Sequence, residues 1–353
     1  MKGNLNEFIN GLEKLRDYIS GVKLQNELLS SNLEEREHCE IHNLIEDIKE
    51  HHMKFRTKKV FEYNTIIISL YGFFERYLEE VIKGYLNELN IIIDDFSNLP
   101  NTISENHHDL SAQLLRNIEL PKYQGVISKN EIIKNLYSCI SNDEFNYKIN
   151  LEAYTYHSSN FRHEEINRFF SNIGINNISH LVKQDSKFKK YMNNNYPEIN
   201  LSNTRDKIVF NKLDDLANRR NDVAHGSVGQ ILNLNLLLEY IEFLEVYGNA
   251  LFNVLYDKIL SYEVKYNSVR LNSPIKIYNN KIIILELENT KIAVGDKIIA
   301  ERNSNYPKYL CGNIKELQID GESYQIISKE KSINIGMEIN FKAKENQIFY
   351  LNK

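Results

Sequence analysis

The stretch from Lys58 to Leu89 constrains the fold most, because its apolar side chains recur at helical spacing and no proline interrupts them. They cover a wide stripe, which predicts a helix at the centre of a bundle. A second pattern of this kind runs from Ile231 to Leu260 and predicts another core helix. The apolar positions of the first stretch are Val60, Tyr63, Ile66, Ile67, Leu70, Phe73, Phe74, Tyr77, Val81 and Tyr85.

Shorter helical patterns fill most of the remaining sequence before residue 264. With only 14 glycines and 5 prolines in 353 residues, the chain contains few helix breakers. Apolar residues recur at helical spacing from Leu5 to Ile19, so we expect an N-terminal helix. Further helices are expected over residues 108–118, 129–141 and 162–172, and another is expected to begin at Ser202–Thr204.

The pattern changes to short strands after Pro274. Ile275–Tyr278 and Lys281–Ile284 flank Asn279-Asn280, which predicts a hairpin with a two-residue turn at positive φ. Turn signals and strand patterns continue to the end, so we expect a small, closed, antiparallel β-barrel of about 80 residues. The predicted fold is therefore mainly α, with a helical domain over residues 1–264 and a β-barrel domain over residues 272–353.

Cysteines and histidines give no basis for a metal site. The 3 cysteines lie far apart, which excludes a disulfide framework or a C-x-x-C zinc site and fits a reducing cytoplasm. His38 and His42 lie four residues apart on an expected helix, but no third ligand follows at a suitable spacing. We therefore expect no bound metal, and a solvated helix face at these histidines.

Missing segments and motifs exclude further classes of protein. No stretch is apolar enough for a membrane-spanning helix, and the first residues lack the apolar core of a signal peptide. We therefore expect a cytoplasmic protein with no membrane partner. The P-loop, dinucleotide-binding and α/β-hydrolase motifs are absent, so no cofactor is expected.

The net charge of −5 is distributed unevenly. Residues 265–353 hold 14 basic and 10 acidic residues, a net of +4, whereas the preceding residues carry a net of −9. This balance excludes a uniformly basic chain but not a local cationic site. One candidate contact for an RNA backbone, with an ordinary charged loop as the alternative, is the lysine cluster Lys183, Lys187, Lys189 and Lys190 beside Phe188 and Tyr191.

The segment Leu213–Gly226 carries the residues best suited to chemistry. Arg220 is a permanent cation suited to phosphate, and His225 can transfer a proton near neutral pH. With Asn221 they form a minimal set for cleaving an RNA phosphodiester without a metal ion. One group would manage a proton, while the other neutralises the charge that develops on the phosphate.

The spacing of these residues sets a geometric condition. Asn221 and His225 lie four apart and share a helix face, but Arg220 and His225 lie about 140° apart around an ideal helix. Either the helix ends or bends near Gly226, or two copies build a composite site across a dimer axis. We predict a homodimer; on spacing alone, a surface arginine and a helix-terminal histidine are the ordinary alternative.

The segment Arg220–Gly226 resembles the R-x4–6-H signature of the HEPN superfamily, including the polar residue that follows the arginine. Three features around it match the same pattern. These are the leucines Leu213 and Leu216, an upstream helix with the acidic Glu75, and the segment Phe161–Phe170, which resembles bacterial stand-alone HEPN nucleases linked to defence.

The resemblance covers roughly residues 55–235. It implies a bundle of four or five helices, here with its core over residues 55–264 and an N-terminal extension, that usually dimerises. Active members are metal-independent endoribonucleases of toxin–antitoxin, CRISPR and phage-defence systems. We therefore expect RNA, with tRNA as the first candidate, as the substrate, and an antitoxin or a phage-derived trigger protein as a candidate partner.

The resemblance also implies roles for single residues. His225 would be the general acid or base, Arg220 would bind the phosphate, and Asn221 would orient one of them. The 2′-hydroxyl would attack, leaving a 2′,3′-cyclic phosphate. Arg219 gives a spacing that the family also allows, and the Asn after Arg220 favours the latter. The supporting candidates are Arg219, Asp222 and Glu75. The alternative is a catalytically inactive HEPN scaffold that binds a nucleotide or a protein.

The β part resembles a different family. Ile292–Ile298, Gly312–Leu317 and Ile335–Ile339 are similar to the second, β-barrel domain of translational GTPases. The GTP-binding domain of those proteins has no counterpart in this sequence, so we infer no GTPase activity. Such a barrel can bind the acceptor end of tRNA or a protein, which suggests a module for substrate delivery or sensing.

Overall fold

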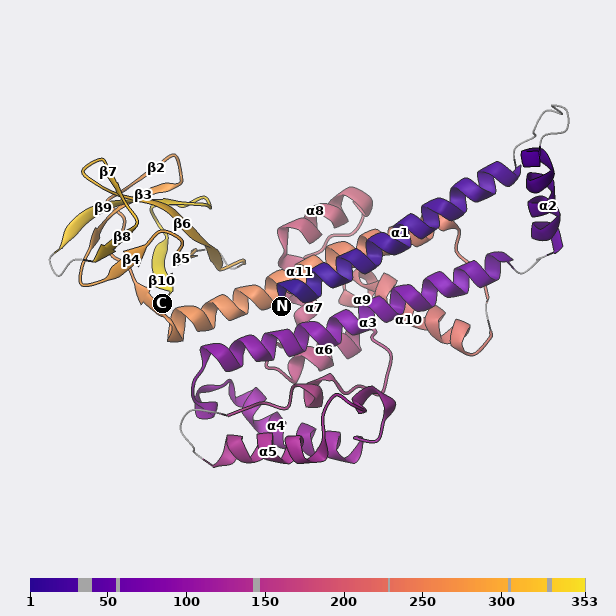
Figure 1. Ribbon diagram of the computed structural model, residues 1–353, viewed down its shortest axis with the longest axis horizontal. Coiled ribbons are helices and arrows are strands. Elements are labelled where there is room, and N and C mark those ends of the chain that lie inside the picture. Colours follow the sequence, from indigo (N-terminus) through magenta and orange to yellow (C-terminus); the bar gives the residue numbers. More distant parts are fainter. Residues whose placement is uncertain are drawn as a thin grey trace. The chain divides into compact units, whose positions relative to one another are not determined.

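The computed structural model describes residues 1–30, 40–54, 58–141, 147–227, 229–303, 306–328 and 332–352. Within these ranges the chain is helical as far as Tyr266, and strands begin at Ser268 (Figure 1). Contacts divide the chain into two compact units. The first combines residues 1–84 with 155–252, and the second combines residues 85–154 with 253–353.

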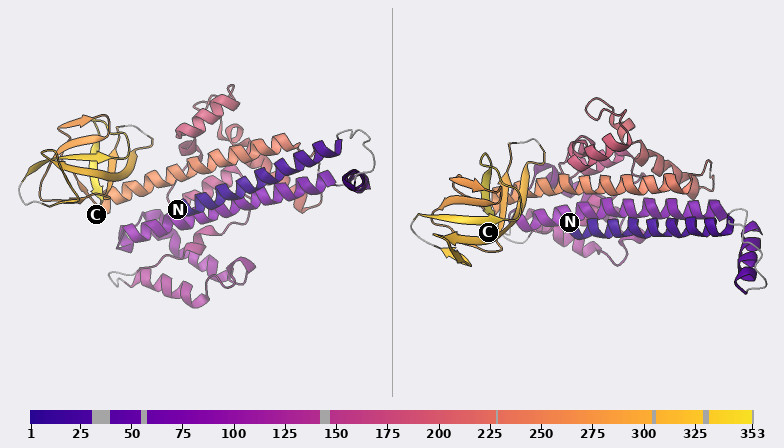
Figure 2. Two further views of the ribbon diagram at one scale, coloured as in Figure 1. Left: turned by 45° about the horizontal axis from the view of Figure 1, so that its top comes forward. Right: turned by 90° about the horizontal axis from the view of Figure 1, so that it is seen from above.

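The first unit is built on α1 (Lys2–Ser30) and on the larger parts of two long helices that continue into the second unit, α3 (Lys58–Ile92) and α11 (Leu234–Tyr266). Within the first unit these three helices lie side by side (Figures 1 and 2). Phe8 of α1 stacks on Tyr77 of α3 with ring centroids 4.4 Å apart. The Tyr77 hydroxyl donates a hydrogen bond to the carbonyl of Gly248 on α11 at 2.8 Å. A Cβ at Gly248 would lie 2.7 Å from the Phe8 ring, so this close approach requires glycine. The expected central helices are confirmed.

Shorter helices complete the first unit. They are α2 (Glu40–Lys54), α6 (His163–Ser171), α7 (Ile178–Gln184), α8 (Ser186–Asn195), α9 (Asp206–Val209) and α10 (Asn211–Ala224). The helix start expected at Ser202–Thr204 is wrong, because α9 begins only at Asp206. Asn200 forms a turn there instead: its side-chain oxygen accepts from the Ser202 N–H at 3.0 Å, and its carbonyl accepts from the Thr204 N–H at 2.8 Å.

The second unit contains α4 (Asn101–Arg116) and α5 (Lys129–Ile140), with short 3₁₀ turns at Phe96–Asn98, Pro121–Tyr123 and, across the unit boundary, Leu151–Thr155. A capping box fixes the start of α5, since Ser128 and Glu131 each accept a hydrogen bond from the other's backbone N–H. Helices were expected in both places, and α4 begins earlier than expected, directly after Pro100.

The β part of the second unit is a curled antiparallel sheet. Its strands are β1 (Ser268–Arg270), β2 (Lys276–Tyr278), β3 (Ile282–Leu287), β4 (Lys291–Ala293), β5 (Lys297–Glu301), β6 (Tyr309–Ile319), β7 (Glu322–Tyr324), β8 (Ile326–Ser328), β9 (Ile333–Ile339) and β10 (Ile348–Asn352). The main sheet has the order β1-β10-β5-β6-β9-β3-β2, with β7 paired to β6, and β4 pairs with β8. The expected hairpin is confirmed, with Asn279 and Asn280 at φ 49° and 56° between β2 and β3.

The sheet curls around a core of aliphatic side chains, among them Ile283, Leu285, Ile298, Leu317 and Met337. Its described strands form an open path with β1 and β2 at the ends, so the expected barrel is a half-barrel rather than a closed one. The mainly α fold with a β part after it is confirmed. The division into separate domains at residues 264 and 272 stays a prediction.

None of the helices in the described ranges combines the length and the apolar character that crossing a bilayer requires.

Candidate active site

The end of α10 places His225 outside the helix. The last helical residue is Ala224, and Gly226 follows at φ +70°. The N–H of Gly226 bonds to the carbonyl of Val223 at 3.1 Å, and the N–H of Ser227 bonds to that of Asp222 at 2.9 Å. This pair of bonds is a Schellman motif, which ends a helix at a glycine in the left-handed region. Of the two geometric solutions that the spacing left open, the end of the helix is present, and His225 is exposed there.

Arg220 lies half-buried on an aromatic surface. The centre of its guanidinium is 5.5 Å from the centroid of the Tyr71 ring on α3. Its Nη1 lies 3.4 Å from the side-chain oxygen of Asn221, a long hydrogen bond. That oxygen also accepts from Nδ2 of Asn160, which precedes α6. The two predicted residues Arg220 and Asn221 are therefore together, framed by two neutral residues from other parts of the first unit.

The Tyr71 hydroxyl bonds to the chain before α6 and to a carboxylate on its own helix, α3. It accepts a hydrogen bond from the N–H of Phe161 at 2.9 Å and donates one to Oε1 of Glu75 at 3.2 Å. Burial, together with the negative charge of Glu75, raises the pKa of Tyr71 well above its usual value, so the phenol remains a donor. Glu75, a supporting candidate, thus bonds to the hydroxyl of the tyrosine on which Arg220 lies.

Arg219 has different surroundings from those of its neighbour. Its Nε donates to Oδ2 of Asp215 at 2.5 Å, and its Nη1 donates at 3.0 Å to both the Tyr63 hydroxyl and the Gln230 carbonyl. Asp215 also accepts from the Tyr240 hydroxyl. Burial lowers the pKa of Arg219, but the hydrogen bonds to Tyr63 and Asp215 outweigh it and raise the pKa above its usual value. These contacts join α10 to α3 and to the chain before α11.

The other candidates are more scattered. Asp222 is exposed and lines a cavity of about 190 Å³ with Tyr63 and Arg219. Lys183 pairs with Asp206 at 2.6 Å, so its charge is already neutralised. The lysines at 187, 189 and 190 are exposed on α8, where the Phe188 ring packs into the core. RNA contact at this cluster stays a prediction.

Sequence reasoning missed two polar residues of the site, His157 and Asn160. Both lie in the irregular segment 156–162, which has neither helical nor strand periodicity to mark an inward face. His157 lies 3.0 Å from Glu79 and 3.7 Å from Glu75, both on α3. The only signal in the sequence was that this segment runs into the start of the Phe161–Phe170 match. It gave no reason to select either side chain.

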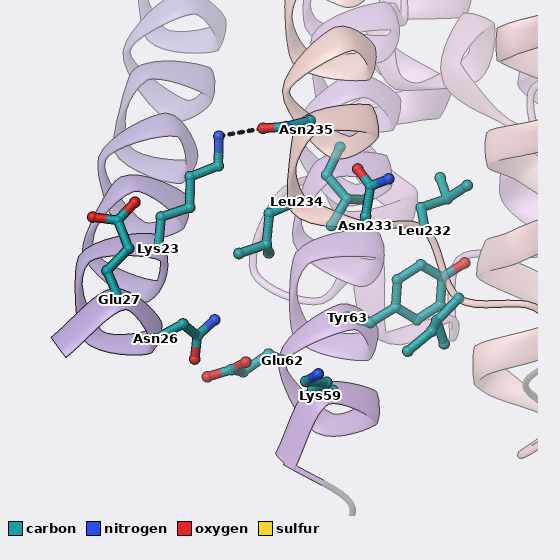
Figure 3. Close-up of a pocket in the computed structure, with 12 residues that line it drawn as sticks. Lys23, Asn26, Glu27, Lys59, Glu62, Tyr63, Leu232, Asn233, Leu234 and Asn235 are labelled. Carbon is teal, nitrogen blue, oxygen red and sulfur yellow. Dashed lines mark hydrogen bonds between the residues drawn. The ribbon is translucent and has the colours of Figure 1, made fainter. Parts of the chain in front are cut away.

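A larger cavity lies elsewhere in the first unit. It has a volume of about 650 Å³ between α1, α3 and the chain entering α11, and Lys23 donates to Asn235 across it at 2.6 Å (Figure 3). Tyr63 lines it, but Arg220 and His225 do not.

Within the described ranges, no group of three His, Cys, Asp or Glu side chains lies close enough together to bind a metal ion. The candidates His38 and His42 fall outside the ranges whose side chains are described.

Comparisons with known proteins place the chain in a family. A model of the RiboL-PSP-HEPN family matches residues 31–257, which is more than half of the chain and includes the whole of α10. No curated protein matches the sequence. HEPN domains are helical, and their general functions are ribonuclease activity or nucleotide binding. The chain belongs to the RiboL-PSP-HEPN family.

Proposed function

We propose that this protein is a metal-independent endoribonuclease that cleaves RNA at a site formed by Arg220, Asn221 and His225. HEPN nucleases act on RNA, which supports the class of substrate. The observation that carries the proposal is the arrangement of Arg220. Its cation lies on the Tyr71 ring beside two neutral amides, and in the described part of the chain it forms no ion pair. A guanidinium held in this way can receive a phosphate.

The proposed reaction is an internal transfer at phosphorus. The 2′-hydroxyl oxygen attacks and loses its proton to a base, while the bond from phosphorus to the 5′-oxygen breaks and that oxygen takes up a proton. The products are a 2′,3′-cyclic phosphate and a 5′-hydroxyl. His225 is exposed and suited to one of these proton transfers, and Arg220 stabilises the charge on the phosphate oxygens.

A second copy of the chain would complete the site. Arg220 is directed onto the Tyr71 ring, whereas His225 lies beyond the end of the helix. HEPN nucleases often dimerise, so a His225 from one copy can act with an Arg220 from the other. Light scattering combined with an activity assay tests this proposal. An active monomer would contradict a composite site.

The biological role that we propose is a toxin or an effector of antiviral defence in the cytoplasm. Structured RNA, tRNA first, is the proposed substrate, and an antitoxin or a phage-derived protein would control the activity. The half-barrel, in the part of the chain with a net charge of +4, would deliver the substrate or sense the trigger.

The test uses wild type, Arg220→Ala and His225→Ala. Each is expressed and purified, then incubated with bulk tRNA in EDTA, and the 2′,3′-cyclic phosphate ends are counted. We expect growth arrest and cyclic ends from wild type alone. If all three proteins fold and none cleaves, the alternative of an inactive scaffold that binds a nucleotide or a protein replaces the enzyme.

A further inference from the structure

The segment 156–162 brings two hydrogen-bond donors to the candidate active site without any regular secondary structure of its own. The Asn160 amide donates to the Asn221 side chain, and the Phe161 N–H donates to the Tyr71 hydroxyl. Asn221 and Tyr71 both contact Arg220. The position of this segment therefore determines how the surface under Arg220 is arranged.

His157 fastens the start of the segment to α3. Its Nε2 lies 3.0 Å from Oε1 of Glu79, and its Nδ1 lies 3.1 Å from the carbonyl of Ser159. The Glu79 carboxylate can only accept, so Nε2 is the donor in that bond. The ring packs against Phe161 with centroids 4.2 Å apart, and only 18% of the side chain is exposed.

A second histidine fastens the other end. The backbone N–H and the Nδ1 of His163 both contact the carboxylate of Asp214 on α10, each at 2.8 Å. The segment is thus held between α3 and α10 by one histidine at each end. His163 is the first residue of α6, a regular element. His157 lies at the irregular start of the segment and is the side chain that attaches this start to α3.

We propose that His157 is a positioning residue for the Arg220 site, acting through its hydrogen bond to Glu79. This inference rests on the proposed function. Without the bond, the segment loses its attachment to α3, and the donors at Asn160 and Phe161 move away from Asn221 and Tyr71. A displacement of this kind costs activity because cleavage needs the phosphate-binding groups in one exact geometry.

Three substitutions of His157 separate the contribution of its hydrogen bond to Glu79 from that of the other contacts of the ring. His157→Gln keeps a donor that reaches Glu79, since its amide nitrogen stands where Nε2 stood. His157→Asn keeps only the nearer donor, toward Ser159, and His157→Phe keeps only the ring packing. Assayed on bulk tRNA, His157→Asn and His157→Phe should each lower kcat by about a hundredfold with little change in KM, and His157→Gln should recover most of the rate. The matched control is His180→Gln, at an exposed histidine on α7.

Two further measurements keep the result interpretable. Glu79→Leu should reproduce the loss seen in His157→Phe, since it removes the other end of the same bond. Amide hydrogen exchange of the peptide that contains Phe161 should speed up in His157→Asn, His157→Phe and Glu79→Leu, but not in His157→Gln. Exchange requires no catalysis, so it tests the inference even if wild type proves inactive and the proposed function fails.

The inference is overturned by any of three results. One is full activity of folded His157→Phe with wild-type cleavage in the same assay. Another is equal rates for His157→Asn and His157→Gln, because the bond to Glu79 would then be irrelevant. The third is unchanged exchange around Phe161 in all variants.

Discussion

Two polar clusters, one in each unit, differ in whether their members are free to bind a ligand or already bond to one another. The first, here called the Arg220 cluster, consists of Arg220, Asn221, Asn160 and Tyr71. Its cation and its two amides are partly exposed, and they lie on the buried ring of Tyr71, so neutral groups surround the cation. The second, the Asn150 cluster, lies in the second unit and is buried. Its bonds are from the Asn150 N–H to His107 at 3.0 Å, from the Asn150 amide to Ser111 and the Ile132 carbonyl at 3.0 and 3.1 Å, and from Asn135 to Asn150 at 2.9 Å.

The difference indicates that the Asn150 cluster stabilises the fold and that the Arg220 cluster is suited to binding a ligand. Buried polar groups that bond to one another stabilise a fold, and removing one leaves its partners unsatisfied. A half-buried cation without an anion is costly for the fold and useful for a ligand that brings negative charge. Substitutions of the partly exposed residues of the Arg220 cluster should therefore lower activity at nearly constant stability, and those in the Asn150 cluster should do the reverse.

The largest expected effect is at Arg220. Arg220→Ala should lower the first-order cleavage rate by about a thousandfold, because the phosphate loses the charge that stabilises it in the transition state. The free energy of unfolding should change by less than about 1 kcal/mol, which is the scale of one exposed cation–π contact. Single-turnover cleavage and urea unfolding measure the two quantities. Arg220→Lys is the control for charge alone, and we expect it to recover only part of the rate, since lysine lacks the planar fork.

The next effect in size concerns the second cluster. Asn150→Ala should lower the free energy of unfolding by about 3 kcal/mol, because Asn135 and Ser111 lose their partner inside the core. The rate of cleavage per folded molecule should stay within about twofold of wild type. Urea unfolding and an active-site titration check this result. A stable Asn150→Ala variant with reduced cleavage would reverse the comparison between the clusters.

A pH effect of intermediate size is expected at His107. Burial, with a smaller contribution from His108, lowers the pKa of His107 from 6.5 to about 4. The unfolded chain therefore takes up a proton that the folded chain refuses, and stability falls as the pH drops from 7 toward 4. Between pH 7 and 5 the loss should be about 2 kcal/mol.

His107→Gln is the variant that isolates this contribution, since it can still accept from the Asn150 N–H but doesn't titrate. Urea unfolding at pH 7 and pH 5 should show a drop that is smaller in the variant by about 2 kcal/mol. Equal drops in both proteins would mean that His107 is protonated in the folded state.

The sequence predicted those features that depend on residues close together in the chain. The central helix α3 and the Asn279-Asn280 turn follow from periodicity and from turn residues a few positions apart. The helix start predicted at Ser202 is wrong because a turn at Asn200 competes with it, and two equally local signals cannot be ranked without their surroundings.

The motif at Arg220 could be predicted for the same reason, because its residues are close in sequence. The hydrogen bonds that hold the residues around Arg220 could not be predicted. The hydrogen bonds of His157, Asn160 and Phe161 join residues 78, 61 and 90 positions apart. They depend on how an irregular segment passes between α3 and α10, and no periodic pattern encodes that path. Both arginines satisfy the spacing, and the Asn after Arg220 favours Arg220 from sequence alone, so the choice between them stays a prediction.

The smallest expected effect tests that choice. Arg219→Lys keeps a charge beside Asp215 but loses the contacts to the Tyr63 hydroxyl and the Gln230 carbonyl. We expect a loss of about 1 kcal/mol in the free energy of unfolding, because both contacts are partly exposed, and cleavage within about threefold of wild type. Tyr63→Phe, which removes one of the same bonds, is the matched control. If Arg219→Lys instead lost as much activity as Arg220→Lys, both neighbours would contact the phosphate. Arg219 would then belong to the phosphate-binding site instead of having only a structural role.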